Sequence, residues 1–265
     1  MTDIIDLPRK KSAEKDRKFV EALARGLDVL RAFGQQGGGV LGNQDLARIT
    51  GLPKPTISRM TYTLTKLGYL AYSTQLEKYQ LDAGVLALGY AYTSNLHARQ
   101  IAKPYMEKLA QRTGVSVGLT IRERMSMIYV ENCRGDDAQA LRMDVGSRLP
   151  IITSAAGRAF LAGLPQSERE VVLSVVEEVA GEHWPAMKAG YDAAMRDYED
   201  KGFCTSLGDW DRTVNAVGVP LTLQDGRVMA LNCGGPAYLV SKETALESLG
   251  PQLIHVAKDI LASGV

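Results

Sequence analysis

The chain has 265 residues, of which 45% are hydrophobic and 23% are charged, and its formal net charge is +1. A chain of this length and composition is globular and long enough for two domains. It has no run of about 18 apolar residues. Its first residues are too charged for a secretory signal, so we expect a cytoplasmic protein. Cys133, Cys204 and Cys233 lack paired spacing, which argues against disulfides and structural zinc, and we expect neither a metal nor another cofactor.

The charge is distributed unevenly along the chain. Residues 1–82 carry 13 Lys and Arg against 9 Asp and Glu, whereas residues 83–265 carry 18 against 21. No acidic residue occurs at positions 46–76, which hold four basic ones. These are Arg48, Lys54, Arg59 and Lys66. A surface without carboxylates can approach phosphates without repulsion, although charge alone does not separate this reading from chance clustering.

The sequence of about the first quarter of the chain predicts a flexible arm followed by three short helices. Residues 1–18 are polar and rich in Lys, as in a flexible arm. Apolar residues then recur at helical spacing from Phe19 until glycines intervene. A second helix is expected from Asn43, which can cap it, to Gly51, and a third from about Lys54 to Gly68. The apolar positions that define these helices are Val20, Leu23, Leu27 and Leu30; Leu46, Ala47 and Ile49; and Ile57, Met60, Leu64 and Leu67.

Two short β-prone stretches follow, at residues 69–72 and 79–81. The polar segment 73–78 lies between them, as expected for a hairpin with a long connection. Three helices and a hairpin within about 65 residues predict a winged helix-turn-helix.

Residues 46–60 have each part of a helix-turn-helix: a short helix, a tight turn with Gly51, and a second helix with one free polar face. Arg59 can donate two bonds to a guanine edge, and Lys54 lies where a helix N-terminus favours a phosphate. The alternative is an ordinary helix pair with a solvated face. The candidate DNA-binding residues are Arg48, Lys54, Pro55, Thr56, Ser58, Arg59, Tyr62, Lys66 and Lys78.

The remaining residues alternate between helical and β periodicity, which predicts an α+β domain with an antiparallel sheet. Pro104 is expected near the first turn of a new helix. Helices are expected over about 84–112, 155–163, 167–180, 186–201 and from 241, and strands over 115–121, 125–130, 203–207, 214–222 and 227–233.

In the order and spacing of its motifs, the sequence resembles the IclR family of bacterial transcriptional regulators over residues 22–261. The motifs lie in the first helix, the turn and third helix, the entry to the hairpin, and three places in the second domain. They are ARGLDVL (24–30), GLPKPTISR (51–59), GYL (68–70), GSRLP (146–150), SAAGRAFLA (154–162) and GP (235–236).

The resemblance implies a winged helix-turn-helix at 19–82, a linker helix at 83–98, and a GAF-like domain at 99–265 with an antiparallel sheet and flanking helices. This last domain would bind an effector and oligomerise. Such a protein would be a sequence-specific repressor or activator that binds a palindromic operator of double-stranded DNA as a dimer or tetramer. A small-molecule effector would change its affinity for DNA.

Carried over by position, the effector cavity would use the segment around Ala155, two strands and the loop at 208–211. Amides at the start of the helix at Ser154 suit a carboxylate, which predicts a small organic acid. Alternatively, Ser154 is only a helix cap and Trp210 only a core or dimer contact. Asn232 and Gly234 replace the small hydroxyl residues common in relatives, so the effector's identity does not transfer. The candidate effector-binding residues are Ser154, Ala155, Ala156, Gly157, Asp209, Trp210, Asn215, Ala216, Asn232 and Gly234.

Two other classes of protein compete with this interpretation. An enzyme is disfavoured, because the three histidines are far apart in sequence and no Walker, GxSxG or HExxH motif occurs. Cys133 would be a reactive thiol only if Arg134 lowered its pKa. A DNA-binding protein whose second domain only oligomerises is the other alternative.

Overall fold

The computed structural model describes residues 18–35, 39–135 and 143–265, so the arm predicted at 1–18 falls outside them except for Lys18. The described chain forms two compact units, which meet in sequence between Asn95 and Leu96. Among the described residues, no helix has both the length and the apolar character needed to cross a membrane.

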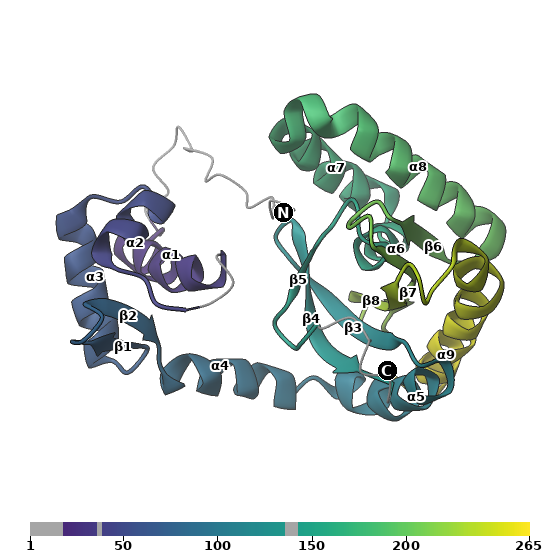
Figure 1. Ribbon diagram of the computed structural model, residues 1–265, viewed down its shortest axis with the longest axis horizontal. Helices are drawn as coiled ribbons and strands as arrows, with labels where there is room; N and C mark the ends of the chain where they lie inside the picture. The colour runs from purple at the N-terminus through teal and green to yellow at the C-terminus, as the bar shows by residue number, and fades with distance from the viewer. Residues whose placement is uncertain (1–17, 36–38, 136–142) are drawn as a thin grey trace. The chain divides into compact units, whose positions relative to one another are not determined.

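The first unit consists of helices and one two-stranded antiparallel hairpin (Figure 1). An isolated bridge between Leu41 and Tyr79 joins the hairpin to the segment before the second helix. The predicted helix-turn-helix with a hairpin is confirmed. Its elements are α1 (Glu21–Gln35), α2 (Asn43–Thr50), α3 (Lys54–Lys66), β1 (Leu70–Ser73), β2 (Lys78–Leu81) and α4 (Ala83–Ser94).

The core of this unit is built from one face of each helix and from the hairpin. Leu46, Ile57 and Leu64 are buried as their spacing predicts. Leu67 was expected on the same face, but 63% of it is exposed, because it lies past the end of α3. The face of α1 that carries Leu23 is also exposed. The core residues of α1 are Val29, Ala32 and Phe33.

The start of α2 differs by one residue from the prediction. The capping residue is Gly42 rather than Asn43. The carboxylate of Asp45 accepts a hydrogen bond from the Gly42 amide at 3.1 Å, which satisfies one of the free amides at this end. The helix ends at Gly51, whose φ of 69° is a left-handed conformation that glycine adopts readily.

The predicted linker helix is shorter than expected. α4 ends at Ser94, where the side chain of Asn95 donates to the carbonyl of Ala91 and so replaces a backbone amide. The next helix, α5 (His97–Thr113), contains Pro104 in its interior rather than near its first turn. The break therefore comes at residues 95–96 and not at the proline.

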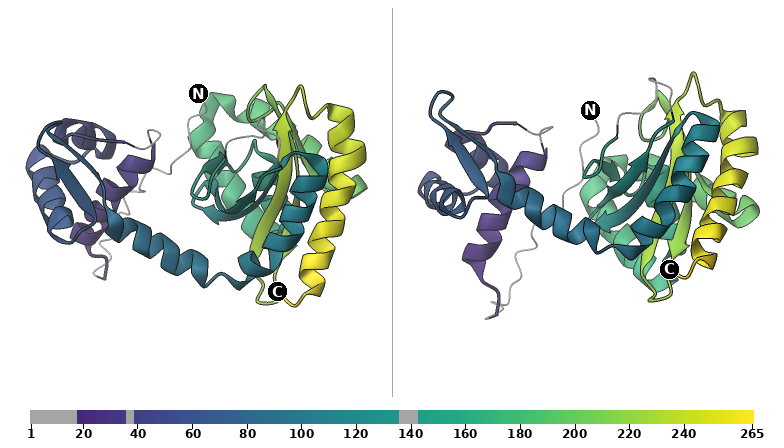
Figure 2. Two further views of the ribbon diagram at one scale, coloured as in Figure 1. Left: turned by 60° about the horizontal axis from the view of Figure 1, so that its bottom comes forward. Right: turned by 90° about the horizontal axis from the view of Figure 1, so that it is seen from below.

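The second unit has a six-stranded antiparallel sheet in the order β5-β4-β3-β8-β7-β6. Helices α5 and α9 cover one face, and α6, α7 and α8 cover the other (Figure 2). The predicted α+β architecture is confirmed. Besides α5, its elements are β3 (Ser116–Glu123), β4 (Ser126–Cys133), β5 (Arg148–Pro150), α6 (Ala155–Gly163), α7 (Gln166–Ala180), α8 (Trp184–Lys201), β6 (Cys204–Leu207), β7 (Val214–Thr222), β8 (Val228–Pro236), a π-helical segment (Thr244–Leu249) and α9 (Gly250–Ala262).

A β-bulge in β4 changes the face to which its side chains point. Leu119 pairs with Glu131, but the next residue, Thr120, pairs with Tyr129, which leaves Val130 as an extra residue. Tyr129 consequently belongs to the core beneath α6, whereas Glu131 forms an ion pair with Arg99 of α5 at 2.8 Å. Bulges of this kind re-aim side chains, often beside binding sites.

Candidate functional site

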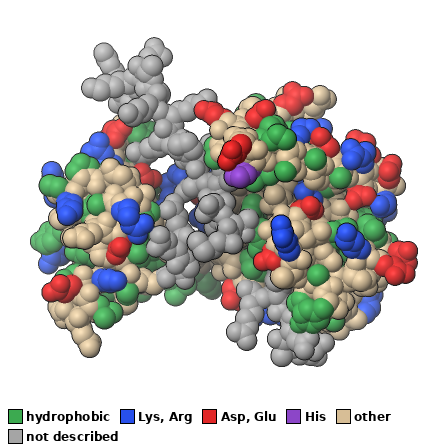
Figure 3. All heavy atoms as spheres, turned by 45° about the horizontal axis from the view of Figure 1, so that its top comes forward, with side chains coloured by type: hydrophobic (Ala, Val, Ile, Leu, Met, Phe, Trp, Pro, Cys, Tyr) green, Lys and Arg blue, Asp and Glu red, His purple; other side chains and the backbone are tan. Residues whose placement is uncertain are grey.

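Helix α3 has one buried face and one exposed polar face. Ile57 and Leu64 pack into the core together with Thr61, whose hydroxyl donates to the carbonyl of Ile57 at 3.0 Å. No acidic residue occurs in this helix, and basic side chains are visible on the surface of the first unit in the space-filling view (Figure 3). The exposed predicted residues of α3 are Lys54, Pro55, Ser58, Arg59, Tyr62 and Lys66.

The other predicted DNA-binding residues flank this helix or lie outside it. Thr56 is half-buried in the first turn of α3. Arg48 is exposed on α2, 3.7 Å from the carboxylate of Asp45, and Lys78 is half-buried at the start of β2. The structure therefore gathers most of the predicted set on one helix and places the remainder on α2 and the hairpin.

A small cavity of about 20 Å³ lies in the second unit, between the first turn of α6 and the sheet. Seven of the ten residues predicted for an effector site line it: Ser154, Ala155, Ala156, Trp210, Ala216, Asn232 and Gly234. Five lining residues were missed by the sequence analysis: Ser116, Tyr129, Leu149, Ser206 and Val214. Polar and apolar side chains thus share a small, partly enclosed site.

The three other predicted residues, Gly157, Asp209 and Asn215, do not line the cavity. The amide of Gly157 donates to the hydroxyl of Ser154, and a Cβ at this position would lie 2.1 Å from the carbonyl oxygen of Ile151. The side chain of Asn215 donates to the carbonyl of Val240 at 2.9 Å. These contacts hold the fold around the cavity.

Ser154 is both the cap of α6 and part of the cavity wall. Its hydroxyl accepts from the Gly157 amide at 3.1 Å and donates to the Pro150 carbonyl at 2.6 Å. Its own carbonyl accepts from the Arg158 amide at 3.0 Å. The first amides of a helix have no carbonyl partner inside it, so those of Ala155 and Ala156 are available to an acceptor at this end.

The guanidinium of Arg158 is buried next to the loop that carries Trp210. Its side chain is 2% exposed and donates to the carbonyls of Ile152 and Thr205 at 3.0 and 2.7 Å. It also donates to the carboxylate of Asp209 at 2.8 Å, and that carboxylate accepts from the amide of Leu207 at 3.2 Å. Arg158 thereby fixes the loop residue next to Trp210. This role of Arg158 was not predicted from the sequence, although a single charge in the apolar segment AAGRAFLAG was a visible signal.

Two polar side chains meet at the sheet side of the cavity. The amide nitrogen of Asn232 in β8 donates to the hydroxyl oxygen of Tyr129 in β4 at 3.0 Å. Burial raises the pKa of Tyr129 to about 12, so this phenol stays protonated. The pair was not foreseen, because the sequence does not show that a bulge turns Tyr129 toward α6.

The comparisons with known proteins agree over both units. Residues 22–73 match the IclR helix-turn-helix domain, and residues 90–262 match the C-terminal domain of the bacterial transcriptional regulator IclR. The chain belongs to the IclR family. It is therefore a DNA-binding transcriptional regulator, which binds DNA through its helix-turn-helix, and not an enzyme.

Individual transcriptional regulators related to this chain match nearly its whole length. The HTH-type transcriptional regulator TsaQ1/TsaQ2 of Comamonas testosteroni is 33% identical, over 94% of this chain and 90% of its own length. The crystal structure of an IclR family transcriptional regulator from Brucella abortus is 43% identical with a TM-score of 0.88, covering 100% of this chain and 99% of its own. An IclR homologue from Microbacterium hydrocarbonoxydans, crystallised with 4-hydroxybenzoate, shares the fold at 24% identity and a TM-score of 0.67, covering 91% and 99%.

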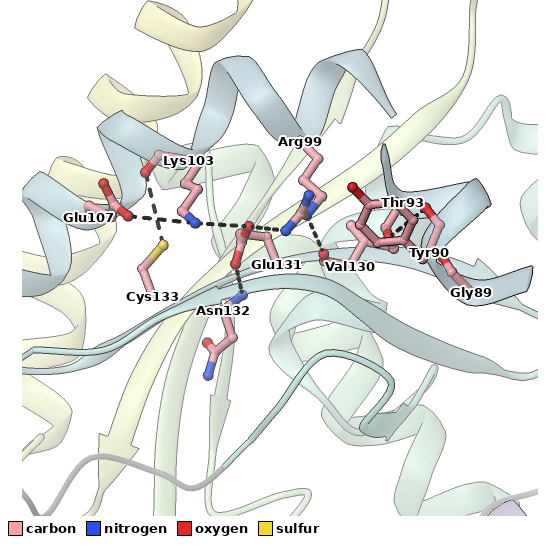
Figure 4. Close-up of polar contacts among 10 residues, drawn as sticks. All are labelled: Gly89, Tyr90, Thr93, Arg99, Lys103, Glu107, Val130, Glu131, Asn132 and Cys133. Carbon is pink, nitrogen blue, oxygen red and sulfur yellow. Dashed lines mark hydrogen bonds and ion pairs between the residues drawn. The ribbon is translucent and has the colours of Figure 1, made fainter. Parts of the chain in front are cut away.

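A reactive Cys133 thiol would require Arg134 to lower its pKa, and Arg134 does not do so. Burial, with the carboxylates of Glu131 and Glu107, raises the pKa of Cys133 to about 12. Figure 4 shows the thiol beside the carbonyl of Lys103 and close to these carboxylates. Arg134 donates to the carboxylate of Asp144 at 2.5 Å. The thiol of Cys133, packed at the end of β4, therefore stays protonated at neutral pH.

The Arg158–Asp209 pair should contribute more to stability than a surface pair of the same form. Asp209 and Asp192 each have side chains that are 40% exposed, but their cationic partners are 2% and 39% exposed respectively. We expect Asp209→Ala to lower the free energy of unfolding by about 2 kcal/mol or more, because it leaves a buried guanidinium without its carboxylate. The control Asp192→Ala should cost less than about 1 kcal/mol. Urea denaturation measures both, and equal losses would contradict this account.

The thiols should be unreactive in the folded protein. Burial raises the pKa values of Cys204 and Cys233 to about 12 as well. At pH 8 only about one such thiol in 10⁴ is a thiolate, the reactive form. We expect Ellman's reagent to modify none of the three cysteines rapidly at pH 8 and all of them in guanidinium chloride. Rapid modification of the native protein would contradict the burial described above.

Proposed function

We propose that a small organic acid binds in the cavity beneath α6 and controls the affinity of this IclR-family regulator for DNA in the cytoplasm. The observation that carries the proposal is the first turn of α6, where Ala155 and Ala156 line the cavity and their amides have no carbonyl partner within the helix. Free amides and the positive end of the helix dipole both favour an anion. Leu149, Val214 and Trp210 supply apolar surface around it.

The small volume of the cavity supports a ligand of modest size. A volume of about 20 Å³ holds about one water-sized group. A larger ligand therefore has to displace part of the wall. We propose that Trp210 moves, since it lies on the exposed loop between β6 and β7 and is itself half-buried. The 4-hydroxybenzoate that was crystallised with the Microbacterium homologue is a small acid of this kind.

We propose that the exposed face of α3 lies in the major groove. Arg59 is exposed and can present its guanidinium to a guanine edge, while Ser58 and Thr56 are short enough to contact either bases or phosphates. The ammonium of Lys66 lies 5.7 Å from the ring centre of Tyr62, on the last turns of the helix. Lys54, Pro55, Arg48 and Lys78 would position the unit on the backbone at either side.

The sequence preference of DNA binding tests this assignment. Fluorescence anisotropy would compare the DNA upstream of the protein's own gene with an unrelated duplex. We expect Arg59→Ala to reduce the preference for the upstream DNA about tenfold or more, because each base contact is worth about 1–3 kcal/mol. The control Lys66→Ala should weaken binding to both duplexes alike, since it removes a phosphate contact. Equal binding of the wild type to both duplexes would contradict specific recognition at this promoter.

We further propose that two copies associate through α4, so that two α3 helices occupy the half-sites of a palindromic operator. α4 has the apolar sequence AGVLALGYAYTS, and none of its residues is buried. Leu86 and Tyr90, one turn apart, are 74% and 71% exposed. A helix that is apolar on all sides requires cover from another surface. A second copy supplies an equally apolar helix, which suits a symmetric interface. A tetramer would add contacts between the second units.

The molecular mass in solution tests the role of α4. We expect the wild type to have at least twice the 28.8 kDa of one chain by light scattering. Leu86→Glu with Tyr90→Glu should at least halve that mass, because charges would be buried in the interface. Val171→Glu is the matched control, since Val171 of α7 is apolar and 64% exposed but lies elsewhere. A monomeric wild type would contradict the dimer, and an unchanged mass in the double variant would contradict the use of α4.

A further inference from the structure

We propose that the effector carries a hydroxyl group in addition to its carboxylate, and that Tyr129 and Asn232 bind this hydroxyl. The inference rests on the proposed function of the cavity as an effector site. It assigns a ligand class, the hydroxycarboxylic acids, and two specificity-determining side chains. Tyr129 and Asn232 come from neighbouring parts of the sheet and line the cavity opposite the first turn of α6.

The side-chain oxygen of Asn232 is the first observation. The residue is 8% exposed, and its amide nitrogen is used by Tyr129. Its Oδ1 atom is buried and has no hydrogen-bond partner within the described part of the chain. A buried acceptor that stays unpaired costs free energy, so this atom favours a ligand that donates a hydrogen bond.

The hydroxyl of Tyr129 is the second observation. Its oxygen accepts from Asn232, which leaves its proton free to be donated to another acceptor. The phenol keeps this proton because burial raises its pKa to about 12. The two side chains together therefore present one donor and one acceptor next to each other.

A hydroxyl group is the ligand group that fits both. It can donate to Asn232 and accept from Tyr129 with a single oxygen. A carboxylate would place a second acceptor against the Asn232 oxygen, and an ammonium could not accept from Tyr129. The volume of about 20 Å³ also corresponds to one group of the size of water. The carboxylate is left for the amides of Ala155 and Ala156 at the other wall.

Gly118 holds the pair in this position. A Cβ there would lie 2.1 Å from the ring of Tyr129 and 3.0 Å from the side-chain oxygen of Asn232. A side chain at position 118 would clash with the ring, so glycine is what allows the ring to pack against β3. A buried ring packed this closely against the backbone has little room to move, and a pre-organised site discriminates more strongly between ligands.

The test uses matched acids that differ by one hydroxyl. Titration calorimetry would compare 4-hydroxybenzoate with benzoate and 4-hydroxybutyrate with butyrate on the wild type, Tyr129→Phe and Tyr191→Phe. Tyr191 is the control because it is a buried tyrosine of the same core that does not line the cavity. We expect the wild type and Tyr191→Phe to bind the hydroxylated member of at least one pair about tenfold more tightly. In Tyr129→Phe this ratio should fall below about threefold, with little change for the acid that lacks the hydroxyl.

The outcomes separate this inference from the proposed function. If the wild type binds the acids but does not prefer the hydroxylated members, the inference is wrong and the organic-acid effector stands. A preference that survives in Tyr129→Phe would likewise overturn the role given to this side chain. If none of the four acids binds to the wild type, both the effector class and the inference are overturned.

Discussion

The buried guanidinium of Arg158 ties together three segments of the second unit. The guanidinium of Arg158 cannot be solvated by water, so its hydrogen bonds must come from the protein, and they come from three separate segments. The bond from Arg158 to the Ile152 carbonyl holds the turn before α6, and the bond to the Thr205 carbonyl holds β6. The bond to the Asp209 carboxylate holds the loop after β6. Trp210 lines the cavity and follows directly after the residue that is held in this way. The geometry of the cavity thus depends on an interaction that lies outside its lining.

The two-domain α+β fold was predictable from the sequence because periodicity and turn residues act locally. The order of elements, the turn at Gly51 and the position of Pro55 in the first turn of α3 follow from such local preferences. The predictions that failed concern which faces of the helices are buried and where one helix ends. Periodicity shows that Leu23 and Leu27 share a face of α1, but not that this face is exposed within one chain. The end of α4 was also missed, because a side-chain bond from Asn95 rather than a proline ends it.

The candidate site was predictable only in part, since its residues come from segments that the sheet brings together. Ser154, Ala155 and Ala156 could be located because the resemblance to the IclR family placed the cavity at this segment, where a helix cap precedes small residues. The role of Tyr129 could not, because it depends on the bulge that makes Val130 an extra residue in β4. Nor does the sequence show that Gly118 leaves room for the Tyr129 ring. The resemblance to the IclR family therefore identified Ala216, Asn232 and Gly234 on the sheet side, whereas only the sheet register identifies Tyr129.

The same bulge explains how the side chains of Tyr129 and Glu131 in β4 point to opposite faces of the sheet. Before it, Tyr129 points to the cavity, and after it, Glu131 points to α5 and forms an ion pair with Arg99. The backbone carbonyl of Val130 itself accepts from Arg99 at 2.9 Å. Arg99 lies in the first turn of α5, five residues after α4 ends. The segment that follows the linker is therefore anchored on the residues next to Tyr129, so the lining of the cavity and the start of α5 share one short stretch of backbone.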